Sequence, residues 1–289
     1  MNEITELAYA KLNISLDVLS KLPDGYHEMC MVMQSVSLFD TLRIRLRSDT
    51  AVHVSTNLPY LPSDDRNIAV RAARAFFKAT NIIGGCDIDI KKRIPVCAGM
   101  GGGSSDGAAV LRALNTLTGK PLAKASLETI GSALGSDIPF CVSGGTVLAE
   151  GKGERLTELQ DFPDCHIVIC KPRFSVSTPE LFSKIDSRTI KFRPDTSGIL
   201  RCLASGDLSG ICQRMYNVFE DVLPPKPGDV AFIKRALVDF GALGALMTGT
   251  GSTVFGIFSD YDSASCAAYF LSGTYDETFL AKPQPKIVI

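Results

Sequence analysis

The feature that most constrains this chain is a glycine-rich stretch from Gly99 to Gly107, which reads Gly-Met-Gly-Gly-Gly-Ser-Ser-Asp-Gly. Glycine tolerates positive φ and lets a ligand approach the bare backbone. The residues that follow, 108–117, have a helical pattern. A glycine-rich loop that leads into a helix presents unpaired N–H groups and the positive end of the helix dipole. We therefore predict an anion site here, most often a site for phosphate.

Two familiar glycine patterns do not fit this stretch. A dinucleotide fingerprint needs a third glycine where Ser104 or Asp106 stands. A Walker A loop needs Lys and then Ser or Thr after its last glycine, whereas Gly107 is followed by alanine. A plain turn ahead of a core helix seldom uses so many glycines. Asp106 would repel a phosphate, so we expect it either to point away or to help hold a cation.

Length, charge and cysteine usage limit the class of protein. The 289 residues predict one large or two medium domains. A net charge of −1 argues against a general nucleic-acid or membrane-surface binder. No apolar run approaches the ~20 residues of a membrane span, and no signal-peptide core begins the chain. The nine cysteines form no C-x-x-C pattern, which favours reduced cysteines in a cytoplasmic protein.

The hydrophobic pattern predicts a strand-rich first part followed by mixed helices and strands. The first strand, 6–18, should place on its core face Leu12, Ile14, Leu16 and Val18. The other expected strands are 29–38, 40–47, 51–55, 87–93, 140–148, 166–170, 245–247, 254–258 and 286–289. The expected helices are 67–80, 108–117, 126–134, 178–182, 199–204, 208–219, 230–240 and 262–271. A glycine turn at 151–153 suggests a soft domain border.

Three short polar segments stand out besides the glycine stretch. Lys11 and Asn13 share one face of the first strand, either as an exposed sheet face or as a functional pair. Asp137 precedes Ile-Pro-Phe and is either a turn or cap residue, or a partly desolvated acid suited to a general-base role. The segment 249–252 is either a plain hairpin turn or a second backbone contact to phosphate or substrate. The three histidines are scattered along the sequence, which disfavours metal chemistry.

Taken together, these segments resemble the GHMP small-molecule kinases. The stretch from Pro95 to Ala109 resembles their phosphate loop, P-x-x-x-G-L-G-x-S-S-A/N. Within that superfamily, the kinases of 4-diphosphocytidyl-2-C-methyl-D-erythritol are similar to this chain in four further segments, 10–13, 24–27, 134–139 and 248–252. The resemblance keeps the same order over 8–258 and is sparse over 187–239. Two departures are mild: Met100 replaces the frequent leucine, and Asp106 stands where asparagine is also common.

The resemblance implies a two-domain α/β (α+β) fold of the GHMP kinase type, with mixed and antiparallel sheets and a nucleotide and substrate cleft between the domains. An N-terminal ATP-binding domain would span 1–155, and a C-terminal domain, 156–289, would complete the substrate site. The implied activity uses ATP and Mg²⁺ to phosphorylate the 2-hydroxyl of 4-diphosphocytidyl-2-C-methyl-D-erythritol in the non-mevalonate route to isoprenoid precursors. The partner would be this small molecule, with no nucleic acid and no membrane, and the chain would be a cytoplasmic monomer or homodimer.

The resemblance also implies roles for individual residues. Asp137 would be the catalytic base, and Lys11 would keep it ionised and lower the cost of charge on the attacking oxygen. The ATP site would comprise Asn67, Ile68, Lys92, Pro95, Gly99, Met100, Gly101, Gly102, Gly103, Ser104 and Ser105. The substrate site would comprise Asn13, Tyr26, His27, Asp137, Thr178, Phe182, Gly249 and Gly251. Among these, His27 would read the cytosine edge and Phe182 would help to sandwich the ring.

Two other functions stay open on this sequence. One is a GHMP kinase that acts on another small alcohol, such as homoserine or mevalonate. The segment 24–27 together with Phe182 favours a substrate with a base over an aliphatic one. The other is a non-catalytic nucleotide-binding module, which would keep the glycine loop without needing both Lys11 and Asp137.

Overall fold

The computed structural model describes residues 2–223 and 228–289. Its strands are β1 (Glu3–Lys21), β2 (His27–Arg47), β3 (Val52–Thr56), β4 (Gly85–Lys91), β5 (Thr146–Gly151), β6 (Arg155–Glu158), β7 (His166–Lys171), β8 (Tyr216–Asn217), β9 (Gly244–Met247), β10 (Val254–Phe258) and β11 (Glu277–Ala281). Its helices are α1 (Ile68–Thr80), α2 (Gly102–Leu117), α3 (Lys124–Ser132), α4 (Ile138–Ser143), α5 (Thr178–Asp186), α6 (Thr196–Ser205), α7 (Leu208–Arg214), the 3₁₀-helix η1 (Val218–Val222), α8 (Asp229–Asp239) and α9 (Tyr261–Ser272). In the described part of the chain, no helix has both the length and the apolar character needed to cross a membrane.

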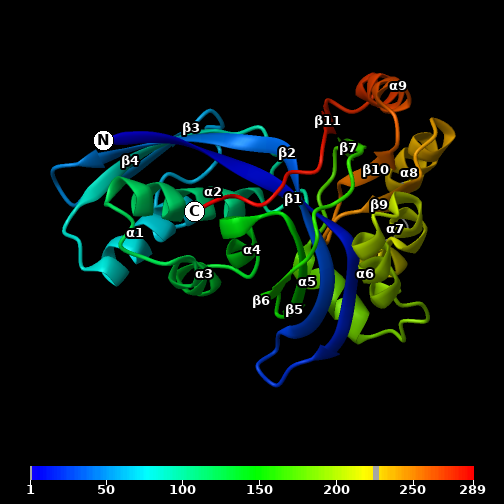
Figure 1. The fold of residues 1–289 in the computed structure, drawn as a ribbon, viewed down its shortest axis with the longest axis horizontal. Coiled ribbons are helices and arrows are strands. Elements are labelled where there is room, and N and C mark those ends of the chain that lie inside the picture. The colour runs from blue at the N-terminus through cyan, green and yellow to red at the C-terminus, as the bar shows by residue number, and fades with distance from the viewer. Residues whose placement is uncertain (1, 224–227) are drawn as a thin grey trace.

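The elements form two lobes that share the long strands β1 and β2 (Figure 1). In one lobe, α1 to α4 lie on one side of the N-terminal strands, and in the other, α6 to α9 surround a second sheet. The larger sheet has seven strands in the order β3-β4-β2-β1-β8, and β5 and β6 extend it from β2. The smaller sheet, β11-β7-β10-β9, is antiparallel throughout. Parallel pairing of β3 with β4 and of β1 with β8 makes the larger sheet mixed, so the predicted combination of mixed and antiparallel sheets is confirmed.

Strand β2 is continuous, whereas the sequence predicted two strands, 29–38 and 40–47. It pairs with β1 along its whole length, with β5 through its first half and with β4 through its second half. The predicted break fell next to Asp40, a charged residue of the kind that strands usually lack. Asp40 is fully buried, and its Oδ1 accepts hydrogen bonds from the backbone N–H groups of Arg93 and Ile94 at 2.5 and 2.8 Å. Tertiary contacts therefore satisfy the charge and let the strand continue.

Strand β1 serves two hydrophobic cores. The predicted core residues Leu12, Ile14, Leu16 and Val18 are all buried. Leu12 and Ile14 pack with residues of β7 and β10, whereas Leu16 and Val18 join the core around α1 and α2. The pairing of β1 with β2 shifts register between Tyr9 and Lys11 and again after Asn13. Because a bulge bends a strand and re-aims its side chains, one strand can line both lobes.

Helix α2 begins earlier than the sequence predicted. It starts at Gly102 instead of 108, so the glycines and serines form its first turn. Gly101 precedes the helix with a φ of +67°, a conformation that favours glycine. Glycine and serine are weak helix formers, which is why the pattern placed the start later. Packing against α1, α4 and β1 supplies the stability that propensity lacks, since this helix is buried on nearly every side.

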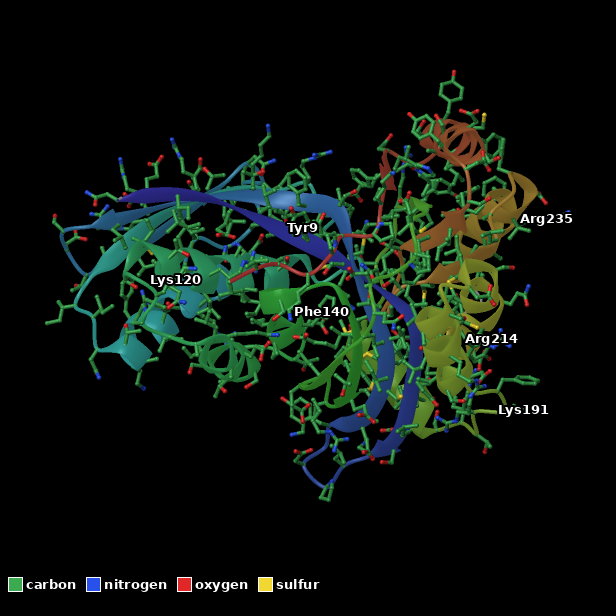
Figure 2. All side chains as sticks on the ribbon, in the orientation of Figure 1. Tyr9, Lys120, Phe140, Lys191, Arg214 and Arg235 are labelled. Atoms are coloured by element: carbon green, nitrogen blue, oxygen red, sulfur yellow. The ribbon has the colours of Figure 1, made fainter. Side chains whose placement is uncertain are left out.

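The prediction of a strand at 140–148 was wrong in its first half, which is helix α4. A short apolar run cannot be assigned to a helix or a strand by periodicity alone, and Pro139 suits a first helical turn. Gly144 and Gly145, both with positive φ, end the helix before β5 begins. In Figure 2, Phe140 of α4 lies in the interior of the molecule, whereas Arg235 lies at the outer edge.

Two further predictions were wrong near the C-terminal end. The helix expected over 208–219 ends at Arg214, because Asn217 caps η1 through a hydrogen bond from the Phe219 N–H. The strand expected at 286–289 is absent from the described structure, and the last strand is β11. The other expected elements are confirmed within a few residues at each end.

The turn at 151–153 joins β5 to β6 within one hairpin. The proposed border between 155 and 156 stays a prediction, and β6 pairs with β5 across it. A border after Glu158 separates the two sheets more cleanly, because β7 belongs to the smaller sheet.

The buried guanidinium of Arg112 ties α2 to both β1 and α4. It donates hydrogen bonds to the carbonyl oxygens of Leu7, Cys141 and Val142, and its Nε lies 3.2 Å from the Glu6 carboxylate. Arg112 is only 4% exposed, so these carbonyls depend on it for their partners. Removal of the guanidinium would leave buried acceptors unpaired.

We predict that Arg112→Met lowers the free energy of unfolding by about 3 kcal/mol, since each buried acceptor left unpaired costs about 1–3 kcal/mol. Urea denaturation at neutral pH measures the change. Arg74→Met is the matched control, because Arg74 is an exposed arginine of α1. Equal unfolding midpoints for the two variants would contradict this role for Arg112.

Candidate active site

Lys11 and Asn13 project from the irregular part of β1. The Lys11 ammonium donates a hydrogen bond to Asn13 Oδ1 at 2.8 Å, and Asn13 Nδ2 lies 3.4 Å from the sulfur of Met31. Lys11 is 5% exposed and Asn13 is fully buried. Asn13 lines none of the three pockets described below, so here it supports the lysine from beneath.

Asp137 precedes α4 and faces Lys11. Its Oδ2 lies 3.5 Å from Lys11 Nζ, and its side chain makes no capping hydrogen bond to the helix. The Asp137 side chain is 31% exposed, whereas the lysine beneath it is buried. The structure therefore brings the two predicted catalytic residues together, with the carboxylate on the accessible side. A carboxylate in this position can accept a proton from a group in the adjoining pocket.

The glycine loop crosses directly over this pair. A Cβ added to Gly101 would lie 3.1 Å from Lys11 Cγ and 3.7 Å from Asp137 Oδ2. The backbone N–H of Lys11 also donates to the carbonyl oxygen of Met100 at 3.1 Å. A side chain at position 101 would push the loop away from the lysine, so glycine is required here for close approach as well as for its positive φ.

The N-terminus of α2 offers an anion site. Its first internal hydrogen bond runs from the Ser105 N–H to the Gly101 carbonyl oxygen at 2.8 Å, so the N–H groups of the preceding residues are free for a ligand. Ser104 faces this site. Ser105 instead donates its hydroxyl to the Tyr9 carbonyl oxygen at 2.6 Å and is buried. Its side chain fastens α2 to β1, and its predicted ATP contact stays a prediction.

A pocket of about 340 Å³ lies in front of this helix N-terminus. It is lined by all the predicted ATP residues except Ser105. Not all of their side chains are free. The Asn67 amide accepts from the Ala69 N–H at 3.0 Å as the cap of α1 and donates to the Pro62 carbonyl oxygen at 2.8 Å. The ammonium of Lys92 is held by two carboxylates beneath the pocket.

A second glycine turn meets the first. A Cβ on Gly99 would lie 2.4 Å from the Thr248 carbonyl oxygen, and a Cβ on Gly249 would lie 2.8 Å from the Gly99 carbonyl oxygen. Two backbones can approach this closely only without side chains. This contact brings the segment 249–251, from the second lobe, against the phosphate loop of the first. Gly249 and Gly251 consequently line the next pocket.

Three pockets join into one continuous cleft. The second pocket, of about 460 Å³, contains Lys11 and Asp137, and residues of both lobes line it. It shares with the first pocket Cys97, Gly99, Gly101 and Ser104. The third pocket, of about 540 Å³, shares with the second Met29, Ser136, Lys152, Thr178 and Phe182. The carboxylate–lysine pair therefore lies between a pocket at the helix N-terminus and a pocket at the tip of the β1–β2 hairpin.

The third pocket has an aromatic lining. The rings of His27 and Phe182 are stacked with centroids 4.5 Å apart and an interplanar angle of 24°, and Phe182 meets Phe219 edge-on at 5.0 Å. Tyr26 is 58% exposed, and the ammonium of Lys152 lies 4.5 Å above its ring. No ring can enter between His27 and Phe182 as they stand, so a flat ligand would use other faces of this pocket.

A buried charge cluster lies beneath the first pocket. Lys92 Nζ lies 2.5 Å from Asp40 Oδ2 and 2.6 Å from Asp106 Oδ2. Asp106 also lines the first pocket, and its Oδ1 is buried without a hydrogen-bond partner. The expectation that Asp106 points away from a phosphate or helps to hold a cation stays a prediction. Burial, opposed by Lys92 and reinforced by Asp40, raises the pKa of Asp106 to about 8. Burial opposes the charge of Lys92, but the Asp106 and Asp40 carboxylates outweigh it and raise the pKa of this lysine.

Sequence reasoning missed several residues of the cleft. Lys152 lies between the second and third pockets, and Asp186 lines the third. The sequence places Lys152 in a glycine turn and leaves Asp186 beyond the expected helix 178–182, and neither setting is a functional signal. Their place in the cleft depends on the folding of the hairpin tip against α5. Asp40, which lies beneath the first pocket, was also missed, because its partners Lys92, Arg93 and Ile94 are distant in sequence.

Two family models match this chain. The model of the GHMP kinase N-terminal domain matches residues 67–145, and the model of the GHMP kinase C-terminal domain matches residues 199–277. Together they cover more than half of the chain.

Two curated relatives of this chain and one solved structure are named as kinases of the same cytidyl compound, and another solved structure is a homoserine kinase. A 4-diphosphocytidyl-2-C-methyl-D-erythritol kinase from Clostridium tetani is 40% identical over 275 residues, covering 95% of this chain and 98% of the relative. A kinase of the same name from Alkaliphilus oremlandii is 42% identical over 283 residues, which cover 98% of this chain and 97% of the relative. The crystal structure of a 4-(cytidine 5'-diphospho)-2C-methyl-D-erythritol kinase aligns with a TM-score of 0.81 at 32% identity, covering 96% of this chain and 98% of that one. The structure of a homoserine kinase from Cytophaga hutchinsonii shares the fold, with a TM-score of 0.76 at 19% identity. The alignment covers 99% of this chain and 96% of that one.

The raised pKa of Asp106 makes stability depend on pH. The pKa of an unfolded aspartate is about 3.9, so the folded state holds this proton more tightly than the unfolded state. The resulting stabilisation is complete below about pH 4 and is lost as the pH rises to about 8. The slope reaches about 1.4 kcal/mol per pH unit.

We predict that Asp106→Asn removes this dependence, because the amide cannot ionise. Urea denaturation at pH 5, 7 and 9 should show wild type losing stability relative to this variant as the pH rises. Asp65→Asn, which neutralises an exposed carboxylate, controls for the loss of one charge. Curves for wild type and Asp106→Asn that run parallel from pH 5 to pH 9 would contradict the assignment.

Proposed function

The chain belongs to the GHMP kinase family, and on that premise we propose that it transfers the γ-phosphoryl group of ATP to the 2-hydroxyl of 4-diphosphocytidyl-2-C-methyl-D-erythritol. Relatives that carry this name match nearly the whole chain at about 40% identity, which bears out the predicted resemblance. The observation that carries the proposal is the position of the Lys11–Asp137 pair within one continuous cleft. The cleft has an anion site at one end and an aromatic pocket at the other.

In the proposed reaction, ATP lies in the first pocket with its phosphates at the N-terminus of α2. The free N–H groups of the loop and the helix dipole hold the phosphates and orient the γ-phosphoryl group toward the second pocket. Phosphoryl transfer needs little covalent help from the protein, since alignment and charge neutralisation supply most of the acceleration. The rigid contact between Gly99 and Gly249 keeps the loop in place for this task.

The acceptor hydroxyl lies beside Asp137, which takes its proton as the oxygen attacks. Lys11, held by Asn13 at 2.8 Å, keeps the carboxylate ionised and favours negative charge on the attacking oxygen. A positioned base of this kind contributes roughly 10²–10⁴-fold to the rate. The cytidine end extends into the aromatic pocket, where Tyr26, His27 and Phe182 provide flat surfaces for a base.

We propose that Mg²⁺ enters as part of the substrate, bound to the phosphates of ATP, where it neutralises charge. Within residues 2–223 and 228–289, no group of three or more His, Cys, Asp or Glu side chains is arranged to hold a metal ion. The other partner is the small-molecule acceptor, and a cytoplasmic location and a monomeric or homodimeric state complete the proposal.

Turnover with different acceptors tests the assignment. The purified protein is offered ATP with the cytidyl substrate, homoserine or mevalonate, and ADP release is followed in each case. We expect turnover with the cytidyl substrate alone, because only that substrate fills the aromatic pocket. Turnover with homoserine or mevalonate but none with the cytidyl compound would overturn the proposal.

We predict that Asp137→Asn lowers kcat by roughly 10²–10⁴-fold while ATP binds almost as before, since the amide cannot accept the proton. Steady-state kinetics measures kcat, and equilibrium binding measures the affinity for ATP. Asp164→Asn, at an exposed aspartate outside the cleft, is the matched control. An unchanged kcat in Asp137→Asn would remove Asp137 from the role of base and would disfavour Lys11 as its partner.

A further inference from the structure

Asp186 contacts the one histidine that lines the cleft. It is the last residue of α5, and its Oδ1 lies 2.7 Å from Nε2 of His27, the first residue of β2. Its Oδ2 accepts a hydrogen bond from Lys21 Nζ at 2.5 Å. Lys21 ends β1, so this carboxylate fastens α5 to both strands of the hairpin. No step of the proposed reaction has used it.

The carboxylate determines which nitrogen of His27 carries the hydrogen. Hydrogen bonds from Lys21 and His27 lower the pKa of Asp186, so it is ionised at neutral pH and can only accept hydrogen bonds. The imidazole nitrogen that faces an acceptor must donate, so Nε2 carries the hydrogen. In a neutral imidazole, Nδ1 is then left with a lone pair. Within the described residues, the ring makes hydrogen bonds only to Asp186.

The ring of His27 is also fixed in orientation. Its side chain is 8% exposed, and Phe182 stacks on one face. The ring lines the third pocket beside Tyr26, at the end of the cleft remote from the ATP pocket. A base bound in the third pocket therefore contacts Nδ1 of His27, which is an acceptor before the ligand binds. Pre-organisation of this kind produces specificity, because a mismatched partner leaves a desolvated polar group unpaired.

Cytosine and uracil differ in the group that such a nitrogen can recognise. Cytosine carries an exocyclic amino group, which donates hydrogen bonds, where uracil carries a carbonyl oxygen, which accepts them. A lone pair on Nδ1 accepts from the amino group and repels the carbonyl oxygen. The printed names of the relatives describe a cytidyl substrate, in agreement with this preference.

We propose that Asp186 is a positioning residue that holds His27 in its Nε2–H form, so that Nδ1 accepts a hydrogen bond from the amino group of cytosine and discriminates against uracil. This inference rests on the proposed function for the nature of the base.

Nitrogen-15 NMR of the histidine rings reads the tautomer directly, and the chain has only three histidines to assign. We expect the Nε2–H form for His27 in wild type. In Asp186→Asn the amide can also donate to Nε2, so the spectrum should show an added or dominant Nδ1–H form. Glu180→Gln is the matched control, because Glu180 is a more exposed acid on α5 that pairs with Lys184. An unchanged His27 tautomer in Asp186→Asn overturns the inference.

Calorimetry measures the specificity, as the ratio of the affinities for cytidine 5'-diphosphate and uridine 5'-diphosphate. Wild type and Glu180→Gln should bind the cytidine compound more tightly. In Asp186→Asn the ratio of the two affinities should fall about tenfold, the effect of roughly one hydrogen bond. An unchanged ratio, or no preference in wild type, overturns the inference. Failure of the proposed function is seen separately, as absence of turnover with the cytidyl substrate by wild type.

Discussion

The close approach of a glycine backbone to a buried lysine is the constraint on which the rest of this structure depends. Gly101 crosses Lys11 so closely that a Cβ would lie 3.1 Å from Lys11 Cγ, a tight contact, and the lysine N–H donates to the carbonyl oxygen of Met100. The contact places the N-terminus of α2 above an ammonium group. The helix N-terminus and the Lys11 ammonium both favour negative charge nearby, and the Asp137 carboxylate lies 3.5 Å from that ammonium. An anion site and an acid–base pair are thus built in one place from a helix, a strand and a loop.

Strand β1 makes this arrangement rigid. Its register shifts around Lys11 and Asn13 aim these side chains at the cleft, while its neighbours enter two different cores. One serine hydroxyl and one arginine then fasten α2 to the same strand, through Ser105 to Tyr9 and through Arg112 to Leu7. Lys11 is therefore held by a strand and Asp137 by the start of α4, and the loops that meet over this pair are held by backbone contacts. Rigid placement of this kind is what phosphoryl transfer needs most.

The sequence predicted the structure correctly where a local pattern of residues determines the element that forms. The alternation of Leu12 to Val18 predicted a buried strand, and the glycine stretch predicted the N-terminus of a helix; the structure has the strand and the helix. The pattern was misleading where tertiary contacts override propensity. Strand β2 was expected as two strands that met just before Asp40, because the Arg93 and Ile94 N–H groups that satisfy this carboxylate are distant in sequence. The first turn of α2 was missed because its glycines form a helix only when packed on all sides.

The sequence by itself determined the family, the phosphate loop and the residue types of the cleft, because glycine runs, a Lys-x-Asn strand and an acid before proline are local signals. Only the tertiary structure decided which of those side chains are free to act. It brought Lys11 within 3.5 Å of Asp137, engaged Ser105 and Asn67 in structural hydrogen bonds, and buried Asp106 under the loop with Lys92. It also set Asp186 against His27 across 159 residues of sequence. Hydrogen bonds and charges act over a few ångströms, and distances of that size between remote residues exist only once the chain has folded.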